Sequence, residues 1–170
     1  MSSRSSGPIT NMKKGFSLIE SIIVITLLGL MFSGIAIFIQ ESINSWLFFS
    51  TQKELLSEAT GAMSRMTREL RLADKNVNII VYTTTQVTIR DVQGNEITFA
   101  QDGAYLKRNN DILAGNLTVP GGLYLRYLKE DGTDASNMNA VRSIWIRLTM
   151  VRENSKVVLE SSAKIRIKKL

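Results

Sequence analysis

Gly15, Phe16 and Glu20 place a small residue, an aromatic residue and a carboxylate within six positions near the N-terminus. Glu20 is the one charged residue between Phe16 and Ile39. A carboxylate near the centre of a bilayer costs about 2.5–3.5 kcal/mol on insertion scales, so it needs a partner. Cleavage after Gly15 would create one, because the free α-amine of Phe16 would lie four residues before Glu20 on a helix, or within reach of a neighbouring copy. Alternatively, Glu20 lies near the membrane interface and snorkels or is protonated.

The residues around Glu20 favour the first interpretation. The stretch from Lys13 to Glu20 reads KKGFSLIE and runs directly into a long apolar segment. It resembles the prepilin cleavage and methylation motif of type IV pilins and type II secretion pseudopilins. The resemblance implies that prepilin peptidase, a membrane aspartyl protease, cuts after Gly15 and N-methylates Phe16, which keeps the positive charge of the amine. It also implies that Glu20 engages the terminal amine of an adjacent subunit during assembly.

Further features resemble the minor subunits of this family. Major pilins usually carry a helix-kinking proline at the place where Ile37 stands. Met66 to Ala73, followed by a many-stranded domain, is similar to J-type minor pseudopilins or W-type minor pilins. The resemblance implies a non-enzymatic minor subunit in a tip or initiation complex of a type IV filament or type II secretion pseudopilus. Its partners would be prepilin peptidase, the inner membrane and sister subunits contacted helix to helix. The resemblance fits filaments that export proteins, filaments that extend as pili and filaments that take up DNA.

A different class of function is a single-pass protein whose periplasmic domain binds a ligand or catalyses a reaction, unrelated to filaments. The chain contains no histidine and no cysteine. Ser-His-Asp and Cys-His mechanisms are therefore excluded, as are disulfides and zinc sites built from cysteine and histidine. A Ser–Lys arrangement is formally possible, but the many serines and lysines suit a solvated surface. We expect no enzyme activity, no metal and no cofactor.

The net charge of +6 partly reflects the N-terminus. Arg4, Lys13 and Lys14 precede Phe16, and without them 18 basic residues face 15 acidic ones, a net charge of +3. The sequence shows no basic helix face and no interleaving of aromatic and basic residues, which nucleic-acid-binding surfaces carry. We therefore predict no nucleic-acid partner.

The apolar run from Phe16 to Ile39 has 24 residues, enough for a membrane helix of about 20. Lys13 and Lys14 precede it and Glu41 follows it, so the positive-inside rule predicts one pass through the inner membrane with a cytoplasmic N-terminus and a periplasmic C-terminal domain. A secretory signal peptide has a shorter apolar core, about 7–15 residues, that ends at an A-x-A-like site. This run is longer, and Ser33 to Ala36 is a poor site in its middle.

The helix is predicted to continue beyond the membrane as far as Ala73. Apolar residues recur there at three- and four-residue spacing, which is typical of an amphipathic helix, and we expect the methionines to pack in a core. These residues are Ile43, Trp46, Leu47, Leu55, Leu56, Ala59, Ala62, Met63, Met66, Leu70 and Ala73. Arg65 and Glu69 form an i,i+4 pair. Gly61 is the expected weak point, and residues 74–76 the expected helix exit.

After the helix the pattern changes to a period of two, which predicts strands. The predicted strands are 86–91, 96–100, 123–128, 141–151 and 156–168, with turns at Gly94-Asn95 and Asp102-Gly103. One face of the later strands is apolar and the other polar, as in an antiparallel sheet with one wet face. The sequence therefore predicts an α+β fold in which a long N-terminal helix packs against one antiparallel β-sheet. The predicted organisation is a cleaved hydrophilic leader (1–15), the transmembrane half of the helix (16–39), its amphipathic half (40–75) and a globular sheet domain (76–170).

Residues 129–139 form a polar segment that contains Glu130, Asp131 and Asp134. Some pseudopilins bind calcium, but the spacing of these acids does not fit an EF-hand loop. We expect a solvated loop and assign it no metal.

Overall fold

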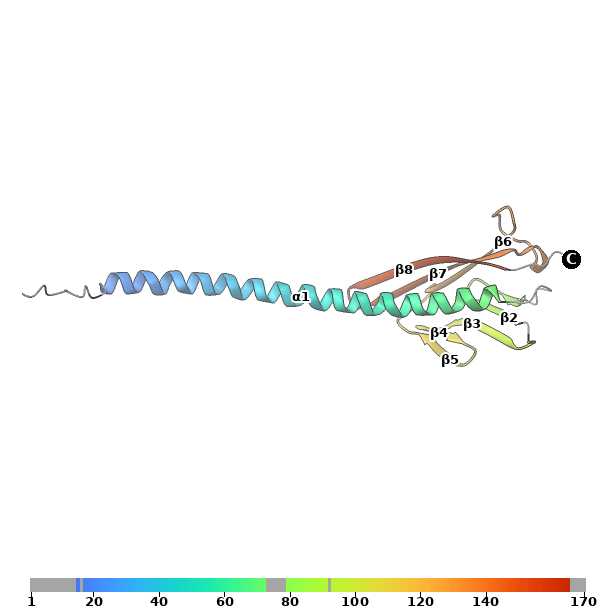
Figure 1. The fold of residues 1–170 in the computed structure, drawn as a ribbon, viewed down its shortest axis with the longest axis horizontal. Helices are drawn as coiled ribbons and strands as arrows, with labels where there is room; N and C mark the ends of the chain where they lie inside the picture. Colours follow the sequence, from blue (N-terminus) through green and yellow to red (C-terminus); the bar gives the residue numbers. More distant parts are fainter. Residues whose placement is uncertain (1–14, 16, 73–78, 92, 166–170) are drawn as a thin grey trace, which may run out of the picture. The chain divides into compact units, whose positions relative to one another are not determined.

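The computed structural model describes residues 15, 17–72, 79–91 and 93–165. Its elements are α1 (Leu18–Arg71), β1 (Ile79–Tyr82), β2 (Gln86–Arg90), β3 (Glu96–Asp102), β4 (Tyr105–Arg108), β5 (Asp111–Ala114), β6 (Leu123–Leu128), the short 3₁₀ helix η1 (Met138–Ala140), β7 (Ser143–Arg152) and β8 (Ser155–Lys164) (Figure 1). The chain divides into two compact units, Met1–Ser45 and Trp46–Leu170. The second unit holds the end of α1 and all the strands.

In the first unit, α1 is apolar on all sides. It contains an 18-residue window of mean hydropathy 2.8, no part of which is buried. A helix that is apolar all round requires hydrocarbon or a protein core around it. By length and composition this helix can cross a membrane, which supports membrane anchoring. Gly29 and Gly34 leave the helix uninterrupted.

In the second unit, one face of α1 is buried against the strands, as the apolar spacing predicts. The buried residues are Leu55, Ala59, Ala62, Met63, Met66, Thr67 and Leu70. The methionines therefore serve as core residues. The Arg65–Glu69 pair also forms, with Nε and Oε1 separated by 3.1 Å, and the helix runs through Gly61 without a break.

The predicted apolar stripe is wrong at Leu56, whose exposed fraction is 45%. Successive helical residues point about 100° apart. When Leu55 faces the core, Leu56 therefore lies to one side of the buried face. Trp46 and Leu47 are also exposed, since the buried face begins at Leu55. Ala73 and residues 74–76, the predicted helix exit, lie outside the described residues.

The strands form two antiparallel sheets, β1-β2-β3-β4-β5 and β6-β7-β8. The α+β fold class is confirmed, but the expectation of a single sheet is wrong. The chain leaves the first sheet after β5. A non-helical segment connects β5 to β6, which pairs with β7. β1, β4 and β5 were not predicted, because each has only four residues and the register shifts within the β1–β2 and β4–β5 pairs.

The predicted turns and long strands are present, and their ends differ by at most two residues except at the end of β8, which stops at Lys164 where 168 was predicted. Gly94 has φ 90° between β2 and β3, and Gly103 has φ 58° between β3 and β4. Such values favour glycine. On β7 the predicted apolar face is fully buried, at Ile144, Ile146, Leu148 and Met150. On β8 the alternation holds as far as Ile165, and the predicted strand residues 166–168 lie outside the described residues.

One hydrophobic core joins the two sheets and the second half of α1. Met66 from α1, Phe99 from β3 and Ile146 from β7 each have no exposed surface within it. Figure 1 shows this half of the helix between β7–β8 and the strands of the other sheet. Gln101 links the sheets at their ends, because its side chain donates to Thr118 O and accepts from Leu123 N–H, each at 2.8 Å.

Candidate processing and assembly segment

Gly15 and Phe16 flank the predicted scissile bond. Gly15 is exposed and precedes α1, and a Cβ added to it would meet no atom within 4 Å. Packing of this chain therefore does not require glycine at this position, so a requirement for glycine would have to come from an enzyme that recognises the segment. Phe16, the predicted site of cleavage and N-methylation, lies outside the described residues, and so do residues 1–14 of the leader.

Glu20 lies in the first turn of α1 and is exposed. A negative charge at a helix N-terminus is stabilised by the helix dipole, by about 0.3–1 kcal/mol at a surface. Its carboxylate makes no hydrogen bond or ion pair with any other residue that the structure describes. The dipole offsets only part of the cost of placing a charge in hydrocarbon.

The hydroxyl groups of the same helical segment behave differently. Thr26 Oγ1 donates to Ile22 O at 2.7 Å, and Ser33 Oγ donates to Leu30 O at 2.8 Å. These bonds satisfy the hydroxyls within the helix itself, as a hydrocarbon environment requires. Glu20 has only acceptor oxygens when ionised and cannot be satisfied in this way. Among the described residues of α1 up to Ile39, the Glu20 carboxylate therefore requires a hydrogen-bond donor from outside its own helix.

The acidic loop after β6 uses its carboxylates locally. Asp131 accepts hydrogen bonds from the hydroxyl and the N–H of Thr133. These bonds hold the pKa of Asp131 below its usual range, and the hydroxyl makes the larger contribution. Asp134 forms a two-pronged ion pair with Arg126 at 3.0–3.1 Å. Over the described part of the chain, no group of three or more acidic side chains is arranged to hold a metal ion.

One cluster in the sheet of β6–β8 was missed from sequence. The guanidinium of Arg147 lies 5.1 Å from the ring centre of Tyr124 and 5.7 Å from that of Trp145, and register places Arg126 opposite Trp145. Aromatic and basic residues therefore do interleave, contrary to the sequence analysis, both along β6 and β7 and across the pair. The signals in the sequence were Tyr124 alternating with Arg126 and Trp145 alternating with Arg147, and the register of β6 against β7 brings the two pairs together. Arg126 is already neutralised by Asp134, and Glu160 lies opposite Arg147 on β8.

Residues 10–36 match a family model described as the prokaryotic N-terminal methylation motif. This match includes Gly15, Phe16 and Glu20. Comparisons with curated proteins and with solved structures gave no match. The motif supports the resemblance to type IV pilins and pseudopilins, and together with the apolar helix it supports membrane anchoring. It implies that the chain is a type IV pilin-like substrate of prepilin peptidase.

Proposed function

We propose that this chain is a minor pilin or pseudopilin, a non-catalytic structural subunit of a type IV filament or type II secretion pseudopilus. The observation that carries the proposal is the methylation motif over residues 10–36. This motif leads into an apolar helix in which Glu20 is the one charged residue before Ile39. The long helix followed by antiparallel sheets agrees with such a role.

Processing is the first step of the proposed function. Prepilin peptidase removes residues 1–15 by cutting between Gly15 and Phe16, and then methylates the new amine of Phe16. The exposure of Gly15 and the open space around it support access to this bond. The remaining chain consists of a transmembrane helical half (16–39), an amphipathic half (40–75) and a globular domain (76–170).

Assembly is the second step, and Glu20 performs it. Its carboxylate accepts a charge-assisted hydrogen bond from the Phe16 amine of an adjacent subunit, a contact worth about 1.5–3 kcal/mol. Water does not compete for this contact in hydrocarbon, which strengthens it. The exposed position of Glu20 in the first helical turn suits an external partner. Helix-to-helix contact with sister subunits follows from the same segment.

Placement in the cell follows from the flanking charges. Lys13 and Lys14 precede the span, so the N-terminus is cytoplasmic and the C-terminal domain lies across the inner membrane, in the periplasm. A minor subunit of the J-type or W-type kind is favoured because Ile37 replaces the usual proline and the helix is continuous there.

Mass spectrometry of the protein from cells with an active prepilin peptidase tests the proposal. We expect N-methylated Phe16 as the first residue. The matched control is the same protein from cells that lack the peptidase, which should retain residues 1–15. An intact N-terminus in peptidase-positive cells would contradict the proposal and favour an anchored domain unrelated to filaments. A terminus beyond Ala36 would indicate a secretory signal peptide.

A further inference from the structure

The outer edge of β8 lacks the protection that the other edge strands have. β1 and β5 are four-residue strands paired with a shift in register. β6 uses its outer edge within the domain, because Leu125 N–H donates to Thr84 O at 2.8 Å. β8 has ten residues in continuous register with β7. Proteins commonly shorten, bulge or cover an edge strand to prevent pairing with other chains. Among the described residues, β8 has none of these features, and only its charged side chains oppose such pairing.

Hydrogen bonds on the far side of β7 show which backbone groups of β8 face outward. Thr149 N–H donates to Gly122 O at 2.7 Å, away from β8, and its partner on β8 is Val158. Opposed antiparallel residues either exchange both bonds or turn both away, so Val158 turns its N–H and C=O to the free edge. Because this direction alternates from one residue to the next along a strand, the N–H and C=O groups of Lys156, Glu160, Ser162 and Lys164 also face the free edge. Within the described chain, the Arg71 guanidinium reaches one of these groups, Ser162 O, at 3.4 Å.

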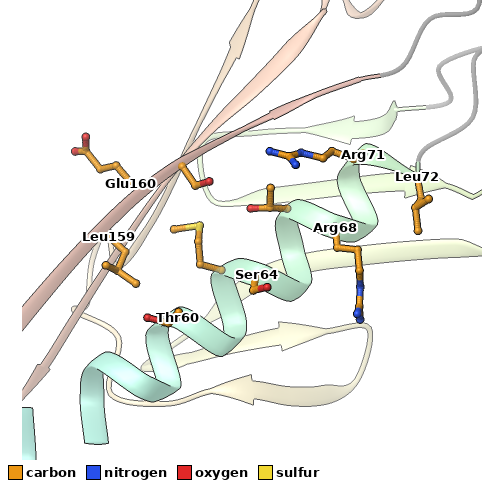
Figure 2. Close-up of a pocket in the computed structure, with 10 residues that line it drawn as sticks. Thr60, Ser64, Arg68, Arg71, Leu72, Leu159 and Glu160 are labelled. Atoms are coloured by element: carbon orange, nitrogen blue, oxygen red, sulfur yellow. The ribbon is translucent and has the colours of Figure 1, made fainter. Parts of the chain in front are cut away.

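Two adjoining depressions run between this edge and α1, and together they form what we term the β8 groove. One has a volume of about 540 Å³ beside Leu159 and Glu160, and the other about 440 Å³ beside Lys156 and Val158. Figure 2 shows the first, with α1 side chains such as Ser64 and Arg68 on one side and the β8 residues on the other. An added strand lies about 4.8 Å from its neighbour, and the groove provides space there for its side chains.

The groove is predominantly basic at its rim. Lys53, Arg68 and Arg71 line it from α1 and Lys156 from β8, whereas Glu160 is the one acid among the described residues that line it. All five side chains belong to exposed residues. Exposed apolar residues such as Phe49, Leu56 and Val158 also line it. Such a surface suits a strand in which acidic residues alternate with apolar ones.

We propose that the β8 groove binds an extended acidic segment of a second protein, which adds to β8 as a further strand. Backbone hydrogen bonds to Val158 and Glu160 supply the pairing, and the basic rim selects acidic side chains. A second copy of this chain is a poorer occupant. Its β8 carries Lys156 and Lys164 against Glu160 alone, so it would bring net positive charge to a basic groove. The proposal does not depend on the proposed filament role.

Peptide binding to the full chain in detergent micelles tests the proposal by fluorescence anisotropy. Three labelled probes are compared: a peptide of alternating Asp and Val, the same peptide with Lys for Asp, and a peptide of residues 156–162. The acidic peptide should bind at least about tenfold more tightly than the other two, and its affinity should fall as salt is added. Equal binding of acidic and basic peptides, or tightest binding of the 156–162 peptide, would overturn the proposal.

Val158→Pro is the decisive variant, because the N–H that it removes faces outward and contributes nothing to the β7–β8 ladder. It should weaken binding of the acidic peptide by at least about tenfold, whereas the matched control Val158→Thr, which keeps the N–H, should bind like the parent. Unchanged binding by Val158→Pro would refute strand addition.

Amide hydrogen exchange of the unmodified chain gives an answer even if the proline variant does not fold. The amides of Val158 and Glu160 should exchange quickly without peptide and become protected when the acidic peptide is present. The neighbouring amide of Leu159, which faces β7, should be protected in both states. Failure of Val158 and Glu160 to gain protection under saturating peptide would contradict the proposal.

Discussion

Glu69 Oε2 accepts a hydrogen bond from Arg108 Nε at 2.7 Å, which joins α1 to β4 over 39 residues of sequence. The exposed fractions of the two side chains are 12% and 23%. The second oxygen of Glu69 accepts from Arg65 on the same helix. One carboxylate thus connects the five-stranded sheet to the helix at the margin of the core.

Glu69→Ala should lower the free energy of unfolding by about 1.5–3 kcal/mol, because it leaves the partly buried Arg108 without its hydrogen-bonded partner. Glu54→Ala is a matched control. Glu54 also joins α1 to a strand, through Arg152 at 3.0 Å, but both side chains are much more exposed, so its loss should cost about 0–1 kcal/mol. Urea denaturation followed by near-ultraviolet circular dichroism measures both. Equal destabilisation would show that burial does not strengthen the Glu69 pair.

A fragment that begins near Gln40 should be soluble and fold cooperatively. Among the described residues, the first buried side chain is that of Leu55, so the fragment keeps the core found in the structure and omits the apolar span. Circular dichroism should show substantial strand content beside one helix. A matched fragment that begins at Ser64 lacks Leu55, Ala59 and Met63 from the core and should not fold. A disordered or wholly helical Gln40 fragment would contradict the independent α+β domain.

The turn between β2 and β3 should weaken in acid. Asp91 Oδ1 accepts from Asn95 N–H at 2.9 Å and from Gln93 N–H at 2.8 Å. These hydrogen bonds hold the pKa of Asp91 below its ordinary value of 3.8, and the bond from the Asn95 backbone contributes most. A lowered folded-state pKa means that this carboxylate stabilises the fold above the unfolded pKa, and that the contribution is lost as the pH falls through the folded pKa.

Amide exchange of Asn95 as a function of pH, measured by nuclear magnetic resonance, tests this dependence after correction for intrinsic exchange. Protection should decline only below the ordinary aspartate range. Asp91→Asn cannot ionise, so its Asn95 protection should not show this acid-dependent decline. An identical decline in the variant would assign the effect to another group.

The parts of the fold that sequence predicts are those in which one period persists over several turns or strand pairs. Ile144 to Met150 alternate without interruption, and Leu55 to Leu70 keep helical spacing, so both buried faces were recognised. The division into two sheets was not, because it depends on whether β6 pairs with β5 in addition to β7. That choice is decided by long-range packing, which no local pattern records.

The candidate site shows the same division. Gly15, Phe16 and Glu20 could be predicted as site residues because their types, order and spacing match a motif, and their roles stay predictions. The β8 groove was not found, since its α1 and β8 sides are about 100 residues apart in sequence and its free edge follows only from strand register. The contact of Arg147 with Tyr124 was missed for the same reason.

Glu20→Val should leave membrane insertion and processing intact but weaken pairing with sister subunits. Removal of the charge makes the span easier to insert, and the scissile bond between Gly15 and Phe16 is unchanged. The variant loses the contact to a Phe16 amine, worth about 1.5–3 kcal/mol as a hydrogen bond to a charged group, which corresponds to about a 10- to 150-fold weaker association. Thr26→Val is the matched control, because its hydroxyl bonds only within its own helix.

Crosslinking within the membrane, with mass spectrometry of Phe16 in parallel, measures pairing and processing separately. The parent and Thr26→Val should crosslink to sister subunits, whereas Glu20→Val should be methylated at Phe16 but should crosslink much less. Glu20→Lys should pair even less, because it opposes two positive charges. If Glu20→Val pairs and supports function like the parent, the acid is only tolerated near the membrane interface, where it snorkels or is protonated, and the proposed assembly contact is wrong.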